Sequence, residues 1–295
     1  MVNVIFNHHE QYGGLVVVLG AVCYAFQLYA DFSGCIDITI GAGEMFGVAI
    51  PENFRQPFFA RTASEFWRRW HMTLGAWLKD YIFFPVSLSR LGKKLTKKAR
   101  RRFGRRAGQI AQTVLPLAAV WLCSGLWHGA GWNYIFYGLY YFVLILLETI
   151  LQPLCEKAAA RLSLDMHGPL IRTLQTVKML LVIFTGELFF RANGLRAGFA
   201  MLGSVFSGFS WSVFTDGTFL QFGLVPGDFA VAGVALLIVL LVDILHERGV
   251  HIREQVSGWK RPLRWCFYYA AILAVIFFGA YGTGYLPADM IYADF

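Results

Sequence analysis

Charged residues are scarce in this chain. Lys, Arg, Asp and Glu together make up 15% of its 295 residues, whereas hydrophobic residues make up 57%. Soluble globular proteins carry roughly 25% charged residues, so this composition excludes an ordinary soluble domain and indicates a membrane protein. The formal net charge of +8 would suit nucleic acid, but the apolar composition and the clustering of the charge argue against such a partner.

Several familiar motifs are also missing. The sequence contains no HExxH, Walker A, GxGxxG or GxSxG pattern, so metalloprotease, nucleotide-hydrolase, dinucleotide-binding and serine-hydrolase functions lack support. Its 5 cysteines form no CxxC pair, and we interpret them as small buried hydrophobic residues. No metal site is predicted. Residues 1–11 lack the basic start of a signal peptide, so we expect the membrane spans themselves to direct insertion.

Apolar runs near spanning length recur along the chain. A spanning helix needs about 20 apolar residues at a rise of 1.5 Å each. The shorter run at 197–209 is expected to be interfacial or re-entrant. The stretch 32–90 is of mixed polarity and rich in Gly and Pro, and we expect it to be interfacial or re-entrant on the cytoplasmic side. The sequence therefore predicts an all-α polytopic fold with about six spans, at 13–31, 110–127, 132–151, 172–190, 228–246 and 264–282.

Basic residues predict the orientation. The stretch 93–106 is dense in Lys and Arg, and we interpret it as a short cytoplasmic loop. A nucleic-acid-binding arm is the alternative, which the flanking spans disfavour. The basic loop 246–264 should be cytoplasmic too. Six spans satisfy both assignments if the N-terminus, the loop 191–227 and the C-terminal Phe295 lie outside.

A first histidine lies in the tryptophan-rich segment 65–71. Residues 62–65, Thr-Ala-Ser-Glu, fit a capping box and predict the start of a helix. If that helix continues, His71 shares an apolar face with Trp67, away from the neighbouring arginines. This favours a buried histidine beside a cavity. A core histidine bonded to a loop carbonyl is the alternative.

A second histidine, His128, lies in Ser124-Gly125-Leu126-Trp127-His128-Gly129-Ala130-Gly131, where the glycines predict a break in the helix. It follows Ile110 by 18 residues, which is roughly 27 Å along a continuous helix and places it in the outer part of the bilayer. Ionisable side chains at membrane depth are functional candidates by default. A neutral imidazole is a suitable general base near pH 7. The alternative is a structural histidine bonded to a neighbouring helix.

Three polar residues near the first span are further candidates. Asp31 and Asp37 are either helix caps or acids that shape the site. Asn53 lies in the turn Pro51-Glu52-Asn53-Phe54, where its side chain bonds either the site or the turn itself.

Four segments, in the same order along the chain, resemble the membrane-bound O-acyltransferase (MBOAT) family. The resemblance is to the bacterial branch that holds the alginate O-acetyltransferase membrane subunit and the D-alanyl transfer protein of teichoic acid synthesis. The segments are FQLYADFSG at 26–34, PENFRQPF at 51–58, EFWRRWHMTL at 65–74 and SGLWHG at 124–129. The ending at 284–295 resembles the same branch. The resemblance implies an MBOAT-like bundle that lacks the family's N-terminal spans, so 1–295 is expected to be a single membrane-embedded domain, the C-terminal portion of the family fold.

The resemblance also implies the site and the reaction. His128 matches the family's catalytic histidine and His71 the second position of its site. No bound cofactor is expected, and an acyl thioester, acetyl-CoA or an acyl carrier protein, would be the co-substrate. The donor would enter from the cytoplasm near His71 and a hydroxyl acceptor would reach His128 from outside. Residues expected to bind substrate are Asp31, Asn53, Trp67, Trp70 and Trp127.

The predicted function is transfer of an acyl group, expected to be acetyl, to hydroxyls of an exported cell-surface polysaccharide. Expected partners are an extracytoplasmic SGNH-type acetyltransferase or esterase-like protein, the acyl donor and membrane lipids, but no nucleic acid. The expected location is the bacterial plasma membrane. D-alanyl transfer to teichoic acid is the closest alternative, although Arg68-Arg69, where some relatives have Asn-Arg, favours the polysaccharide branch. A transporter or flippase and a non-catalytic membrane subunit are alternatives of a different class.

Overall fold

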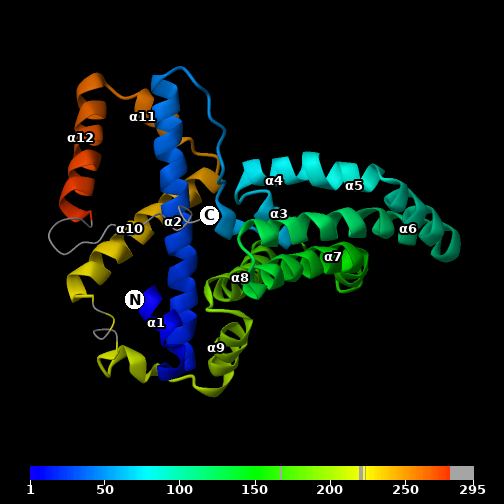
Figure 1. Ribbon diagram of the computed structural model, residues 1–295. Coiled ribbons are helices and arrows are strands. Elements are labelled where there is room, and N and C mark those ends of the chain that lie inside the picture. Colours follow the sequence, from blue (N-terminus) through cyan, green and yellow to red (C-terminus); the bar gives the residue numbers. More distant parts are fainter. Residues whose placement is uncertain (167, 219–221, 223, 280–295) are drawn as a thin grey trace. The chain divides into compact units, whose positions relative to one another are not determined.

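The structure, a computed structural model, describes residues 1–166, 168–218, 222 and 224–279 (Figure 1). Within these ranges the regular elements are all helices. The chain divides into two compact units, Met1–Val213 and a second that begins at Phe214, and each is described by itself. The expected single domain over 1–295 stays a prediction, and the expected location of Phe295 concerns a residue outside the described ranges.

Six of the described helices are long and apolar enough to cross a membrane. The predicted all-α polytopic fold is therefore confirmed. The first unit holds four of these helices: α2 (Gly14–Met45), α6 (Arg90–Trp127), α7 (Trp132–Arg161) and α8 (Pro169–Arg191). The second unit holds the other two: α10 (Pro226–Glu247) and α12 (Arg261–Phe278).

Shorter helices complete both units. In the first unit they are α1 (Val2–Asn7), η1 (His9–Gln11), η2 (Pro57–Phe59), α3 (Ala63–Trp67), α4 (Met72–Leu78), η3 (Lys79–Phe83), α5 (Phe84–Leu88) and α9 (Leu195–Ser207). The short turn η4 (Trp211–Phe214) follows α9, and α11 (Ile252–Ser257) lies between α10 and α12. The helix α9 overlaps the run at 197–209 that was expected to be too short to span.

Small residues let the long helices of the first unit approach closely. The helix α6 packs along α7, and α2 packs against α8 and α9 (Figure 1). A Cβ added at Gly125 of α6 would lie 2.6 Å from the backbone oxygen of Tyr134 on α7. One added at Gly138 of α7 would meet the backbone oxygen of Trp121. The α6–α7 contact thus depends on the absence of side chains at these two positions, as is common where helices pack within membranes.

The first long helix extends further than the sequence predicted. The helix α2 continues to Met45, so residues 32–45 are helical and not irregular. Asp31 and Asp37 therefore lie inside α2, and their interpretation as helix caps was wrong. The segment contains glycines but no proline. A helical glycine costs only about 1 kcal/mol relative to alanine, whereas a proline costs about 3 kcal/mol, so the glycines do not end the helix.

The helix predicted to start at residue 62 is interrupted after one and a half turns. The helix α3 ends at Trp67, α4 begins at Met72, and His71 between them has left-handed backbone angles, φ 46° and ψ 52°. The expectation that Trp67 and His71 share one apolar face of a continuous helix was therefore wrong. Contacts from the loop around Asn53, described below, stabilise the interruption.

The basic block is helical as well, where a loop was expected. Residues 90–103 form the first part of α6, and Gly104 interrupts the helix with φ 87° and ψ −179°. Beyond this break α6 continues without another interruption to Trp127. The estimate of roughly 27 Å between Ile110 and His128 assumed a continuous helix, and the structure has one over these residues.

Candidate functional site

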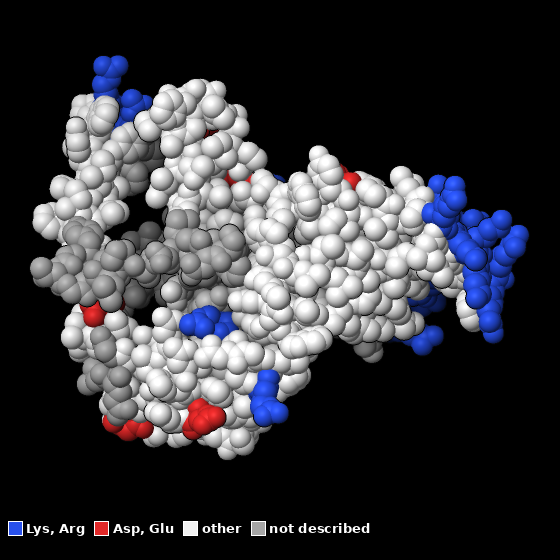
Figure 2. Space-filling view, in the orientation of Figure 1, with Lys and Arg blue, Asp and Glu red and all other residues white. Residues whose placement is uncertain are grey.

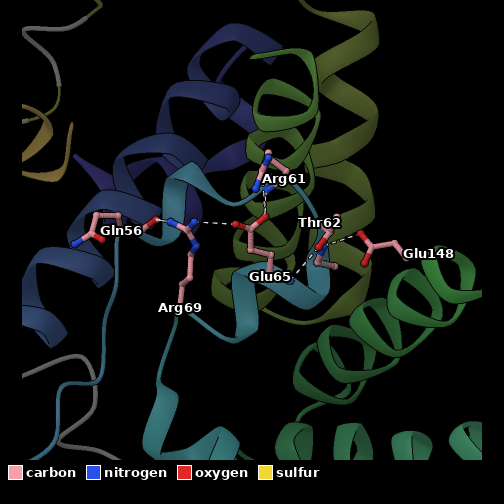
Figure 3. Close-up of polar contacts among 7 residues, drawn as sticks. Gln56, Arg61, Thr62, Glu65, Arg69 and Glu148 are labelled. Carbon is pink, nitrogen blue, oxygen red and sulfur yellow. Dashed lines mark hydrogen bonds and ion pairs between the residues drawn. The ribbon is translucent and has the colours of Figure 1, made fainter. Parts of the chain in front are cut away.

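The short helix α3 is anchored at its N-terminus by charged side chains (Figure 3). The Thr62 hydroxyl accepts a hydrogen bond from the Glu65 amide at 3.0 Å, as a capping box requires. The Glu65 carboxylate accepts from the Arg61 amide at 2.9 Å and pairs with the Arg69 guanidinium at 2.8 Å. Burial raises the pKa of Glu65, but the Arg61 amide and the charges of Arg69 and Arg61 outweigh it and hold the pKa below its ordinary value.

A glutamate from a distant helix completes this anchor. Glu148 of α7 accepts hydrogen bonds from the Ala63 amide at 2.6 Å and the Ser64 amide at 3.2 Å (Figure 3). A carboxylate at a helix N-terminus satisfies amides that have no partner within the helix. The position of α3, which carries Trp67, is thus fixed against α7.

Asn53 holds the interruption at His71. Its side-chain oxygen accepts from the Thr73 amide at 3.1 Å and from the Thr73 hydroxyl at 2.7 Å. Its backbone oxygen accepts from the Met72 amide at 3.1 Å. The same side-chain oxygen lies 3.2 Å from Nδ1 of His71. One buried asparagine therefore caps the start of α4 and orients the imidazole beside it.

These contacts determine the tautomer of His71. Because the Thr73 amide can only donate, the Asn53 atom that faces it is an oxygen, and His71 Nδ1 must then carry the proton that it donates to this oxygen. The lone pair is consequently on Nε2. Burial lowers the pKa of His71 to about 4, so the ring is neutral near pH 7.

Trp127 connects the two histidines. Its ring centroid lies 5.8 Å from that of His71 and 4.7 Å from that of His128. On its other side, His71 contacts Phe32 of α2 edge-on, with 4.8 Å between the ring centroids. Segments far apart in the sequence thus converge on one aromatic cluster that holds both imidazoles.

His128 lies at the break between α6 and α7. It caps the end of α6, is only 4% exposed, and is followed by Gly129 with φ 141°, which a residue with a side chain rarely adopts. Its ring contacts Phe190 of α8, with centroids 4.9 Å apart, and Tyr137 of α7 at 6.4 Å. The second histidine is thus buried among three helices of the first unit.

A buried carboxyl group behind His128 was not predicted. Glu187 of α8 is 2% exposed, and its Oε1 accepts a hydrogen bond from the Tyr137 hydroxyl at 2.9 Å. An acidic residue inside the apolar run 172–190 is a signal that would have identified it from the sequence. Further buried polar atoms with no hydrogen-bond partner among the described residues are Trp67 Nε1, Trp121 Nε1, the Tyr141 hydroxyl and Glu187 Oε2.

A cavity of about 440 Å³ adjoins His71. Its lining is mostly apolar, with Trp67 and Trp121 along one part, and it also includes Ser124 of α6. Two cationic side chains, Arg68 and Lys79, belong to the lining and are exposed. The cavity therefore combines an apolar interior with positive charge, and a neutral imidazole contributes to its wall.

The predicted site residues fall into two groups. His71 and Trp67 line the cavity, Asn53 orients His71, and Trp127 links His71 to His128. Two other residues predicted to bind substrate, Trp70 and Asp31, are not among the described residues that line it. Trp70 is 4% exposed and stacks on Phe66 in the core, and Asp31 is half-buried on α2 next to Phe32.

Potential metal ligands do not gather within the described ranges. No group of three or more His, Cys, Asp or Glu side chains there is arranged to hold a metal ion.

The helices and the buried histidines define a polytopic membrane protein with ionisable side chains inside its bundle. Residues 11–99 match the model of the MBOAT, membrane-bound O-acyltransferase family. Together with the relatives below, this match confirms the resemblance that the sequence motifs carry.

Curated relatives belong to three kinds of transferase. A probable alginate O-acetylase of Azotobacter vinelandii is 35% identical over 195 residues, 66% of this chain and 34% of the relative. A peptidoglycan O-acetyltransferase of Helicobacter pylori is 30% identical over 182 residues, 62% of this chain and 30% of the relative. A teichoic acid D-alanyltransferase of Bacillus subtilis is 32% identical over 139 residues, which are 47% of this chain and 32% of the relative. The chain spans about a third of the length of these relatives.

Proposed function

We propose that this chain is the histidine-bearing part of a membrane O-acyltransferase. The main support is the aromatic cluster in which Trp127 contacts both His71 and His128. His71 lies on the wall of an apolar cavity, and His128 is buried at a helix break. A neutral imidazole in a site that excludes water is suited to remove a proton from an alcohol. The family match and the relatives named as acetyl- and D-alanyltransferases support the same chemistry.

The reaction is an acyl transfer in which His128 acts as general base. The imidazole takes the proton of the acceptor hydroxyl while that oxygen attacks the thioester carbonyl carbon. A new C–O bond forms and the C–S bond breaks. His128 then transfers this proton to the leaving thiolate, which departs as a thiol. Such a base contributes roughly 10² to 10⁴ in rate.

The cavity beside His71 is assigned to the acyl donor. Its apolar interior suits an acyl chain or the arm that carries it, and Arg68 and Lys79 suit an anionic carrier. His71 with its proton fixed on Nδ1 presents Nε2 as an acceptor, so it would orient a donor group of the substrate and does not itself polarise the carbonyl. We therefore assign His71 a binding and positioning role and His128 the proton transfer.

The finer assignment follows the alginate and peptidoglycan relatives. We propose that the acyl group is acetyl, that the donor is acetyl-CoA or an acyl carrier protein on the cytoplasmic side, and that the acceptor is an exported cell-surface polysaccharide. An extracytoplasmic SGNH-type protein would carry or receive the acyl group. The protein would be a multi-pass component of the bacterial plasma membrane, with no bound cofactor.

D-alanyl transfer to teichoic acid is the second candidate, because relatives with that name match 40–47% of this chain. The two candidates differ in the donor. Membranes that contain the protein, supplied in turn with acetyl and D-alanyl thioesters, would label the polymer with one acyl group and not with the other.

The test of the function is His128→Ala in the complete protein, with any N-terminal helices that its natural form carries. We expect loss of polymer O-acylation, measured by release of labelled acyl groups under mild base, at normal membrane abundance. His246→Ala, which changes a histidine of the second unit, is the matched control and should leave acylation unchanged. Near-normal acyl transfer by the His128→Ala protein would overturn the enzymatic role, and a transporter or a non-catalytic subunit would become the better explanation.

A further inference from the structure

The first part of α6 carries a dense group of cations, none of which forms an ion pair with an acid among the described residues. The stretch 93–106 holds 9 Lys or Arg residues, and the sequence has no Asp or Glu between Asp80 and Glu148. Figure 2 shows Lys and Arg gathered at one end of the first unit. Five of these residues border one surface depression, Lys94, Lys97, Lys98, Arg101 and Arg102. So many like charges in one place attract anions.

The break at Gly104 separates this basic segment from the membrane span. Residues 105–127 alone amount to roughly 34 Å of helix, enough for a hydrocarbon core of about 30 Å. At Gly104 the chain turns back: a Cβ added at Gly108 would lie 2.8 Å from Cβ of Arg100, so the two parts of α6 approach each other there. Residues 90–103 are thus a separate helix attached to the end of a span.

This separate helix is amphipathic. Leu91, Leu95, Ala99 and Phe103 recur every four residues and form an apolar stripe, while most of the cations occupy the remaining faces. The stripe is not covered: Leu91 is 57%, Leu95 40% and Phe103 71% exposed. An uncovered apolar stripe between cationic faces is the pattern of a helix that lies in a membrane interface.

We propose that residues 90–103 form an interfacial helix that binds the surface of a bilayer rich in anionic phospholipids. The lysines and arginines would contact headgroup phosphates, and Leu91, Leu95 and Phe103 would enter the boundary with the acyl chains. The occupant is a lipid surface because only Gly104 separates this helix from the span that begins at residue 105, so headgroups lie within its reach. Each basic residue near such a surface strengthens binding about fivefold. This inference is independent of acyl transfer.

The first experiment measures the depth of the apolar stripe. The full chain, with Cys23, Cys35, Cys123, Cys155 and Cys266 changed to Ala, is labelled with an environment-sensitive dye at Leu95→Cys or, as the matched control, at Lys97→Cys. Both are placed in nanodiscs of phosphatidylcholine with or without 30% phosphatidylglycerol. We expect a blue shift at position 95 on adding phosphatidylglycerol, reversed by high salt, and little change at position 97. Equal spectra at position 95 in both lipids would overturn the proposal.

The second experiment measures lipid selectivity. The unmodified protein, extracted from mixed nanodiscs, should retain phosphatidylglycerol in preference to phosphatidylcholine. Changing Lys93, Lys94, Lys97 and Lys98 to Gln should reduce that preference at least tenfold, and changing the same four to Arg should preserve it. Neutralising the exposed Lys157, Arg161 and Arg172 serves as the control and should have a smaller effect.

Two results would contradict the proposal. An unchanged preference in the Gln variant is the first. The second is a shift at position 95 in pure phosphatidylcholine nanodiscs on adding millimolar inorganic pyrophosphate, which would assign the cations to a soluble phosphate ligand. If the Gln variant does not accumulate, the salt dependence of the unmodified protein and the Arg variant decide the matter.

Discussion

The side-chain oxygen of Asn53 lies 3.2 Å from Nδ1 of His71, although 18 residues separate them in the sequence. The same oxygen accepts both polar hydrogens of Thr73, and the backbone oxygen of Asn53 accepts the Met72 amide. This one residue therefore determines where α4 begins, which nitrogen of His71 carries the proton, and how the imidazole meets Trp127.

Replacing Asn53 by Ala should destabilise the protein and impair acyl transfer together. The Thr73 amide and hydroxyl lose their acceptor, and part-buried groups left without a partner cost about 1–3 kcal/mol. His71 loses the contact that fixes its tautomer. The checks are the apparent unfolding temperature in detergent and the rate of acyl transfer. Glu52→Ala, a change at the exposed neighbour, should alter neither; equal behaviour of the two variants would contradict the role of Asn53.

Comparing His71→Gly with His71→Ala separates backbone strain from side-chain chemistry. The left-handed angles of His71 disfavour alanine by roughly 1–2 kcal/mol, whereas glycine adopts them freely. We expect the Gly variant to unfold at a higher temperature than the Ala variant, while both lose most acyl transfer. Recovery of activity in the stable Gly variant would show that the imidazole is dispensable.

The α6–α7 crossing should not tolerate a methyl group at Gly125. The added Cβ would lie 2.6 Å from a backbone oxygen of α7, so one helix must shift next to His128. We expect Gly125→Ala to lower the unfolding temperature and acyl transfer. The matched control is Gly34→Ala in α2, where nothing lies within 4 Å of the added Cβ and alanine should stabilise the helix by about 1 kcal/mol. A Gly125→Ala protein as stable as the control would contradict this account of the crossing.

Glu65 should make stability fall in acid. Its pKa in the folded protein is below the ordinary value because the Arg61 amide and the charges of Arg69 and Arg61 outweigh the effect of burial. The ionised carboxylate therefore favours folding above the unfolded pKa of about 4.3, and this contribution disappears as the pH falls through the folded pKa. Unfolding temperatures measured between pH 6 and pH 3 should decline less steeply for Glu65→Gln. Identical slopes would show that the pairing contributes nothing.

Periodic features of the sequence predicted the fold well. Apolar runs of spanning length predicted all six candidate spans, and the glycine-flanked His128 predicted the break between α6 and α7. Both signals are local, because they depend on side-chain polarity and on glycine within a few residues. The capping box at Thr62 is equally local and is present.

One interpretation failed because it depended on a distant contact. The helix through His71 is interrupted because Asn53, 18 residues earlier, supplies competing hydrogen bonds, which no helical period reveals. The assignment of Asp31 as a helix cap failed for a local reason, because the glycines that follow it do not end α2. Substrate binding by Trp70, whose ring stacks on Phe66 in the core, stays a prediction. Glu187 could have been predicted from the sequence, because it is an acidic residue inside an apolar run, but it was missed.

The bond between Glu148 and the N-terminus of α3 also has a bearing on the order of folding. A helix of five residues is not stable alone, so α3 depends on its anchors. One of them, Glu148, is synthesised 85 residues after Ala63. At 5–20 residues per second, ribosomes need roughly 4–17 s to make this segment. During that interval α2 and the basic helix can already meet the membrane, whereas the segment that presents His71 must wait for α7 to arrive.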